Sequence, residues 1–163
     1  MGTVTRSRSA NIPVTITLDS LATSADLTVG VQSDDFIIGA NCFDVTVSGV
    51  IVGNSVAPTD VMSIEVWLIP QRTDGYWPDT FTDTNGARTV SSRNELWAYG
   101  KLIKSIPTNA AVSHSYSFEE RLTNCLGSAA LPSSCVIFVT HKMGQALAAT
   151  GSSIGYVEHT AGY

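Results

Sequence analysis

Charge is scarce in this sequence. Asp, Glu, Lys and Arg together make up 14% of the 163 residues, against roughly 25% in an average soluble protein. The few charges are mostly acidic, since 14 acidic residues stand against 9 basic ones and give a net charge of −5. This balance argues against binding to a nucleic-acid backbone through counterion release. A surface with so little charge suits a protein that lies against other proteins, and it equally suits a neutral soluble β-domain.

Long apolar runs are missing as well. None approaches the roughly 18 residues of a membrane-spanning helix, although hydrophobic residues make up 44% of the chain. Residues 1–8 lack the apolar core of a signal peptide. We therefore expect a protein that is made in the cytoplasm and binds no membrane. The apolar content instead fits a single domain with a buried core.

Cysteine is also sparse. Cys42, Cys125 and Cys135 are odd in number and have no C-x-x-C spacing, which argues against a zinc ribbon and against a fully paired disulfide framework. Cys42 and Cys135 lie beside strand-like runs and are predicted to be buried thiols. A Cys125–Cys135 disulfide across one loop is the alternative to three reduced cysteines.

Helical periodicity is the last absence: no stretch predicts a helix longer than a turn or two, and residues 119–122 predict one such turn. Short runs of β-branched and aromatic residues fill the chain instead, many of them alternating apolar with polar side chains. They lie at residues 14–18, 27–31, 43–52, 61–69, 96–106, 112–118, 136–139 and 154–157. We predict an all-β fold, an antiparallel, jelly-roll-like β-sandwich of about eight strands. Residues 13–163 form its single domain.

Several details refine this fold. Gly49 predicts a bulge or a bend, and Pro70 ends its strand because proline cannot donate a ladder hydrogen bond. Residues 136–139 carry no charge and predict a strand buried on both faces, which forms a closing hairpin with residues 154–157. Two sets of side chains on the strand at residues 61–69 face opposite ways: Ile64, Val66 and Leu68, and Glu65, Trp67 and Ile69.

Two segments outside the strands are candidates for partner binding. Residues 1–12 predict an N-terminal extended arm that carries Arg6 and Arg8 and orders against a neighbouring subunit, a frayed terminus being the alternative. Residues 71–95, rich in Asp, Asn, Gly, Thr and Ser, predict a long loop. Its aromatic residues are Tyr76, Trp77 and Phe81. They suit an interface anchor and equally a lid that folds back over the end of the core, and the lid is favoured for Trp77.

A catalytic serine motif is present in form. Residues 151–155 match G-x-S-x-G with Ser153 at the nucleophile position. Only eight residues follow the motif, too few for the required helix, and the only later acid and histidine are Glu158 and His159. Neighbouring residues on a strand point in opposite directions. We therefore predict a Gly/Ser-rich turn here and no enzyme.

Metal and cofactor sites are not predicted either. His114, His141 and His159 have no second ligand at the spacings that metal sites use. The oxygen-bearing side chains of residues 74–85 resemble a calcium loop, but the EF-hand spacing fails because Ser92 stands where the glutamate belongs. No glycine-rich phosphate loop is present.

Two stretches carry a resemblance to a known family. They are residues 65–79, in which EVWLIP precedes DGYWPD, and residues 136–154, VIFVTHKMGQALAATGSSI. This chain resembles small virion proteins of tailed bacteriophages, in which a strand ending in Leu-Leu-Pro precedes an Asp-Gly loop with aromatics, and a late strand precedes a small-residue ending. The resemblance covers residues 61–156 except 123–134. His141 departs from the family's lysine, and residues 125–135 replace a short Pro-rich turn.

The resemblance implies a non-enzymatic β-sandwich of a phage virion, made in the host cytoplasm. Within that class we expect a capsid cement or decoration protein on the outer surface of the capsid, which binds major capsid protein as a homo-oligomer. Tyr76, Trp77, Phe81, Arg6 and Arg8 are the expected contact residues. The alternatives are an adaptor that binds tail proteins of the same virion, in the tail, baseplate or fibre, and a carbohydrate-binding module that stacks sugars on aromatic rings including Trp97.

Overall fold

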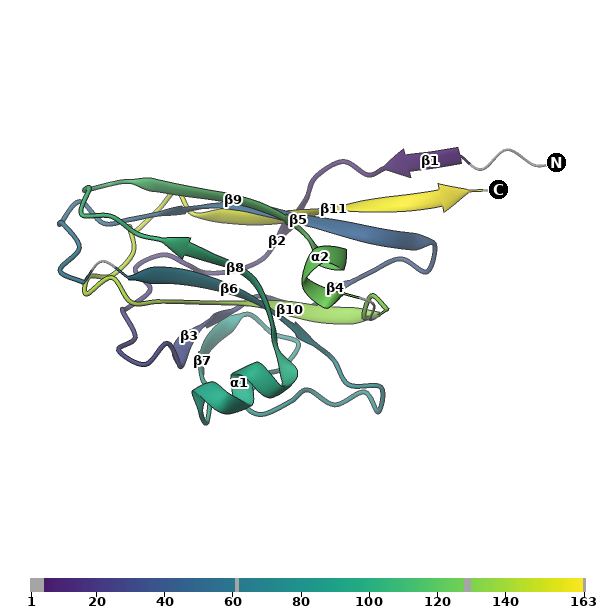
Figure 1. Cartoon of the computed structure of the whole chain (residues 1–163), viewed down its shortest axis with the longest axis horizontal. Coiled ribbons are helices and arrows are strands. Elements are labelled where there is room, and N and C mark those ends of the chain that lie inside the picture. The colour runs from purple at the N-terminus through teal and green to yellow at the C-terminus, as the bar shows by residue number, and fades with distance from the viewer. Residues whose placement is uncertain (1–4, 61, 128–129, 163) are drawn as a thin grey trace.

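A computed structural model describes residues 5–60, 62–127 and 130–162, and it confirms the predicted antiparallel β-sandwich (Figure 1). Sheet A has the strand order β1–β11–β5–β9, with β2 also paired to β11. Its strands are β1 (Thr5–Arg8), β2 (Ile12–Val14), β5 (Cys42–Val52), β9 (Ser115–Arg121) and β11 (Ser153–Gly162).

Sheet B has the order β7–β3–β10–β6–β8, with β4 also paired to β10. Its strands are β3 (Val29–Gln32), β4 (Phe36–Ile37), β6 (Ser63–Pro70), β7 (Gly86–Thr89), β8 (Lys101–Pro107) and β10 (Ser134–His141). Two short helices complete the described structure, α1 (Arg93–Tyr99) and α2 (Leu122–Leu126). Neither is long and apolar enough to cross a bilayer, and the described residues contain no other helix.

The connectivity is that of a jelly roll. Strands β2, β11, β5 and β9 lie side by side in sheet A, and β3, β10, β6 and β8 lie side by side in sheet B. Apart from the β6–β8 pair, the chain moves to the opposite sheet at each step along these eight strands, which is how two interlocked Greek keys form a sandwich. The described residues contain eleven strands rather than about eight, because β1, β4 and β7 are added to this set.

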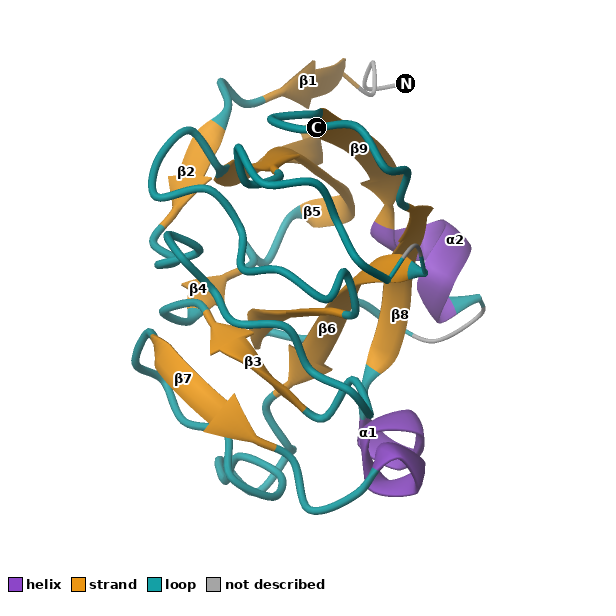
Figure 2. Cartoon of the chain, turned by 90° about the vertical axis from the view of Figure 1, so that its left-hand side faces the viewer, coloured by secondary structure: helices purple, strands orange, loops and turns teal. Residues whose placement is uncertain are grey.

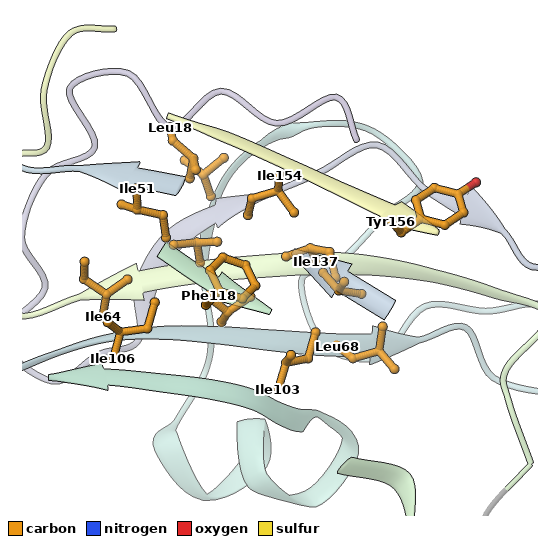
Figure 3. Close-up of a cluster of buried hydrophobic side chains, with 14 of the residues drawn as sticks. Leu18, Ile51, Ile64, Leu68, Ile103, Ile106, Phe118, Ile137, Ile154 and Tyr156 are labelled. Atoms are coloured by element: carbon orange, nitrogen blue, oxygen red, sulfur yellow. The ribbon is translucent and has the colours of Figure 1, made fainter. Parts of the chain in front are cut away.

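The main core lies between the two sheets (Figure 3). Alternate residues of β5 and β6 point into it, as the sequence predicts, and are fully buried: Val45, Val47, Ile51, Ile64, Val66 and Leu68. Further core residues come from β9 and β11, the neighbours of β5 in sheet A, including Phe118, Ile154 and Tyr156. Alternate residues of both sheets thus point between the sheets, and the removal of their apolar side chains from water is the main driving force for this fold.

The outer face of sheet B is covered by residues 71–85 and 90–100, the segments before and after β7, which include α1 (Figure 2). Apolar side chains of these segments pack against β6 and β10 and form a second apolar cluster with them. Its members are Trp67, Ile69, Phe81, Val90, Leu96, Val136 and Phe138. All eight residues of β10 are consequently buried, as predicted for residues 136–139. The two predicted faces of β6 are also confirmed, since Ile64 points to the main core and Trp67 to the second cluster.

Two predictions for residues 71–106 are wrong. The loop contains β7, and residues 96–99, predicted as the start of a strand, belong to α1. Ser92 caps the start of the helix, since its side chain accepts a hydrogen bond of 3.1 Å from the Glu95 N–H. This Ser-x-x-Glu spacing is that of a capping box, and it outweighs the strand-like composition that follows.

Other predictions need correction. β10 and β11 are not a hairpin, because they lie in different sheets. Register through Gly49 is continuous, so no bulge occurs there; a Cβ at Gly49 would lie 2.6 Å from the Ser153 carbonyl oxygen, so close packing explains this glycine. The predicted turn at residues 119–122 is displaced, since Glu119 lies in β9 and α2 begins at Leu122.

Candidate interaction site

The three loop aromatics have three different environments. Phe81 is 4% exposed and packs edge-on against Phe138, with ring centroids 5.3 Å apart. Phe81 thus folds back onto the core, as the lid alternative predicts, and its choice as an exposed anchor is wrong, because the outer face of sheet B supplies an apolar surface for its ring. Trp77 is half-buried against the second cluster, which confirms that it folds back onto the core. Tyr76 alone of the three is exposed, at 73%.

A tight turn fixes the backbone that displays Tyr76. Its carbonyl accepts a hydrogen bond of 2.9 Å from the Arg72 N–H, and its N–H donates to Asp74 Oδ1 at 3.1 Å. Gly75 adopts φ of +82°, a value that glycine tolerates best. Its N–H donates to the Arg72 carbonyl, and its own carbonyl accepts from Gln71 Nε2 at 2.9 Å. The aromatic ring therefore projects from an ordered backbone.

Asp79, which follows the turn in sequence, links it to α1 through hydrogen bonds. Its carboxylate accepts hydrogen bonds from the Ser91 hydroxyl at 2.6 Å and from Tyr99 Oη at 2.8 Å. Burial raises the pKa of Asp79, but the hydrogen bonds from Ser91 and Tyr99 outweigh it and leave that pKa lowered. Burial and the hydrogen bond to Asp79 raise the pKa of the Tyr99 hydroxyl well above its ordinary value. The Tyr76 turn is thus anchored to the sandwich.

Arg6 and Arg8 lie at the edge of sheet A. From residue 5 onward the predicted arm pairs with its own chain as β1, with Arg6 opposite Ala161 and Arg8 opposite His159 of β11. Residues 1–4 lie outside the described residues. Figure 1 shows β1 as the outermost strand, beside the C-terminal end of β11. All four side chains of β1 are exposed.

An open groove of about 480 Å³ lies beside β1. Its lining residues come from four strands and are Arg6, Ser7, Arg8, Phe43, Thr46, Glu119, Arg121 and His159. The Arg6 guanidinium lies 5.6 Å from the centre of the Phe43 ring, within the range of a cation–π contact. His159 Nε2 lies 2.8 Å from Thr46 Oγ1. The predicted residues Arg6 and Arg8 thus meet Arg121, more than a hundred positions away along the chain.

Arg121 also has a structural role at the floor of this groove. Its Nε lies 2.5 Å from Asp44 Oδ2, an ion pair without the alignment of a hydrogen bond. Asp44 is 1% exposed, and its other oxygen accepts from the N–H groups of Val45 and Thr123. Removing Arg121 would leave a buried carboxylate without its cation. Arg6 and Arg8 are therefore the residues to alter when the groove is tested.

Ser153, Glu158 and His159, the residues of the formal serine motif and its possible partners, make separate contacts. Ser153 begins β11 and is exposed, and the groove beside it is lined by other small or apolar residues, with no histidine or carboxylate among those described. Glu158 accepts a hydrogen bond from the Gly39 N–H at 2.8 Å, while His159 contacts Thr46. No hydrogen bond joins Ser153 to Glu158 or His159 within the part of the chain that the structure describes.

The histidines and cysteines are dispersed. His114 packs edge-on against Tyr116, His159 lies on sheet A, and His141 is in the interior. Across the described ranges, no group of three or more metal-ligating side chains is close enough to hold an ion. All three cysteines are free thiols. Cys135 is buried as predicted, whereas Cys42 is only half-buried, and burial raises the pKa of each thiol.

His141 makes stability depend on pH. It is fully buried, its Nε2 lies 3.0 Å from the Leu21 carbonyl oxygen, and its Nδ1 has no partner in the described structure. Burial lowers its pKa, whereas an unfolded histidine binds its proton near pH 6.5. The unfolded state therefore binds more protons as the pH falls below about 6.5, and the folded state loses stability.

We expect the His141→Gln variant to lose less stability than wild type between pH 7.5 and pH 5.5, as measured by urea unfolding at each pH. The exposed residue His114 supplies the control, and His114→Gln should keep the wild-type loss. An equal loss in wild type and both variants would contradict the role of His141.

The sequence matches no protein-family model and no curated protein.

Proposed function

We propose that this chain is a non-enzymatic structural protein of a tailed-phage virion, a cement or decoration protein that binds major capsid protein on the outside of the capsid. The observation that carries the proposal is the display of Tyr76. Four hydrogen bonds order the turn around it, and the ring is left 73% exposed. A ring on an ordered backbone loses little conformational entropy on binding, which suits an interface anchor.

Three further features support this proposal. The Tyr76 turn lies within residues 65–79, one of the two stretches that resemble phage virion proteins. Jelly rolls occur in viral capsid domains, and also in lectins and cupins, so the fold permits the function without selecting it. A shell offers many symmetric copies of one junction, and such multivalency turns modest single contacts into firm attachment.

The test is binding of the purified chain to empty capsid shells of the phage that encodes it. Sedimentation with increasing amounts of chain should give saturable binding, at a copy number set by the symmetry of the shell. Saturable binding to isolated tails and not to shells would favour the tail-adaptor alternative. Binding to neither particle would contradict a virion role.

Tyr76→Ser should weaken attachment to shells about tenfold, because an anchoring aromatic contributes on the order of 1–2 kcal/mol or more. Its free energy of unfolding should stay within about 0.5 kcal/mol of wild type, since the ring is exposed. Val112→Ser, which alters another exposed apolar residue, serves as the control and should bind as wild type does. Unchanged shell affinity of the Tyr76 variant would remove this turn from the interface.

The described structure does not assemble the aromatic residues of the carbohydrate-binding alternative into one platform, although Tyr76 and Trp97 are exposed. A sugar platform needs exposed aromatic faces side by side. Trp77 packs into the second cluster, and Trp97 packs edge-on against Trp67 at 79°. Among the described residues no ring pair joins Tyr76, Trp77 and Trp97. We expect tryptophan fluorescence to remain unchanged across a panel of glycans, and a saturable shift with any of them would revive this alternative.

A further inference from the structure

We propose that β1, the edge strand of sheet A, binds an extended acidic segment of the protein partner by strand addition, with carboxylates at alternate positions beside Arg6 and Arg8. This inference rests on the proposed function, which supplies a protein partner, and it identifies the chemistry of one contact. It is carried by Arg6 and Arg8, which form no ion pair with any described side chain in a protein of net charge −5.

The charges of the groove favour an anion. Arg121 is matched by Asp44, and among the described residues Glu119 is the one carboxylate that lines the groove. Two exposed guanidinium groups therefore remain to be satisfied from outside. Arginine forms bidentate hydrogen bonds with carboxylates, and these are stronger than bonds between neutral groups.

The spacing of the two arginines favours a strand over a small anion. Arg6 and Arg8 lie two positions apart on an antiparallel strand, so their side chains leave the same face roughly 7 Å apart. A neighbouring strand with Glu or Asp at every second residue repeats at the same interval.

The edge of sheet A supplies backbone partners for that segment. β1 is the last strand in the sheet order, so its outer N–H and C=O groups face no other described strand. Addition of an extended peptide to such an edge is a common mode of recognition. A second copy of β1 is a poor occupant, because antiparallel self-pairing would bring the arginines of the two copies together.

The experiment uses the full chain and a synthetic acidic peptide, acetyl-Thr-Glu-Val-Glu-Thr-Glu-amide, with its three Glu→Gln counterpart as the matched control. We expect the acidic peptide to bind with a dissociation constant below about 1 mM, and the glutamine peptide at least tenfold more weakly. Arg6→Ala combined with Arg8→Ala should weaken acidic-peptide binding about tenfold. Arg72→Ala, which removes an exposed arginine on the Tyr76 turn, should leave it unchanged.

Hydrogen exchange locates the peptide: the amides of β1 should exchange more slowly in the complex. Equal affinity for both peptides would overturn the inference and indicate an edge that the arginines merely protect from aggregation. Binding that inorganic phosphate displaces at equal concentration, or that leaves β1 unprotected, would indicate a small-anion site and also overturn it. If shells bind wild type and the double arginine variant alike, this inference fails while the proposed function stands. If shells bind neither protein but the peptide results are as expected, the proposed function fails and this inference stands.

Discussion

Arg93→Ala is expected to lower the free energy of unfolding by about 3 kcal/mol, the lower end of the cost of breaking a buried ion pair. Arg93 donates from both terminal nitrogens to the Glu65 carboxylate, at 2.6 Å each. The Glu65 side chain is 8% exposed and that of Arg93 29%. Without the arginine, Glu65 keeps one hydrogen bond, from Trp67 Nε1 at 2.9 Å, and its charge is buried without a cation.

The matched control is Arg72→Ala, which breaks an ion pair with Asp74 whose side chains are 63% and 45% exposed. Exposed pairs of this kind contribute less than about 1 kcal/mol. Urea unfolding at pH 7 measures both variants. Equal losses would show that the Arg93–Glu65 contact is no stronger than a surface pair and that α1 is held to sheet B by apolar packing alone.

Gly30→Ala is the second large effect, an expected loss of about 3 kcal/mol or failure to fold. An added Cβ would lie 2.2 Å from the Val139 carbonyl oxygen and 2.7 Å from the Phe138 ring. The carbonyl belongs to the paired strand β10, so it cannot move without breaking the sheet. Overpacking of a rigid interior typically costs about 1–3 kcal/mol, and more where backbone must shift.

Gly86→Ala is the control for this substitution, because Gly86 lies on β7, the strand paired with β3. Its added Cβ would meet only the end of the Arg88 side chain at 3.4 Å, and the free energy of unfolding should change by less than about 1 kcal/mol. Thermal unfolding compares the two variants. A stable Gly30→Ala protein would contradict the close packing of β3 on β10.

Local pattern predicted much of the fold. The alternation in residues 61–69 assigned Ile64, Val66 and Leu68 to one face of β6 and Trp67 to the other, and Pro70 marked its end, all of which the structure confirms. Each of these features depends on neighbours within one strand. Which strands pair with each other depends on residues far apart in the sequence. The predicted hairpin of β10 and β11 therefore proved wrong, although both segments are strands.

The remaining errors have the same origin. Phe81 lies in a polar segment and is buried by Phe138, 57 positions later on the outer face of sheet B. The helix α1 had a readable signal in Ser92 and Glu95, which the apolar run after it obscured. The groove could not be found from spacing, because its arginines meet only once β1, β5, β9 and β11 are assembled into one sheet.

Electron cryomicroscopy of empty shells incubated with the purified chain shows whether the chain coats the capsid, and where. We expect a jelly-roll density on the outer surface, repeated at symmetry-equivalent junctions of the capsid protein, with the Tyr76 turn at a contact. Shells that stay bare at saturating concentrations of chain would contradict it.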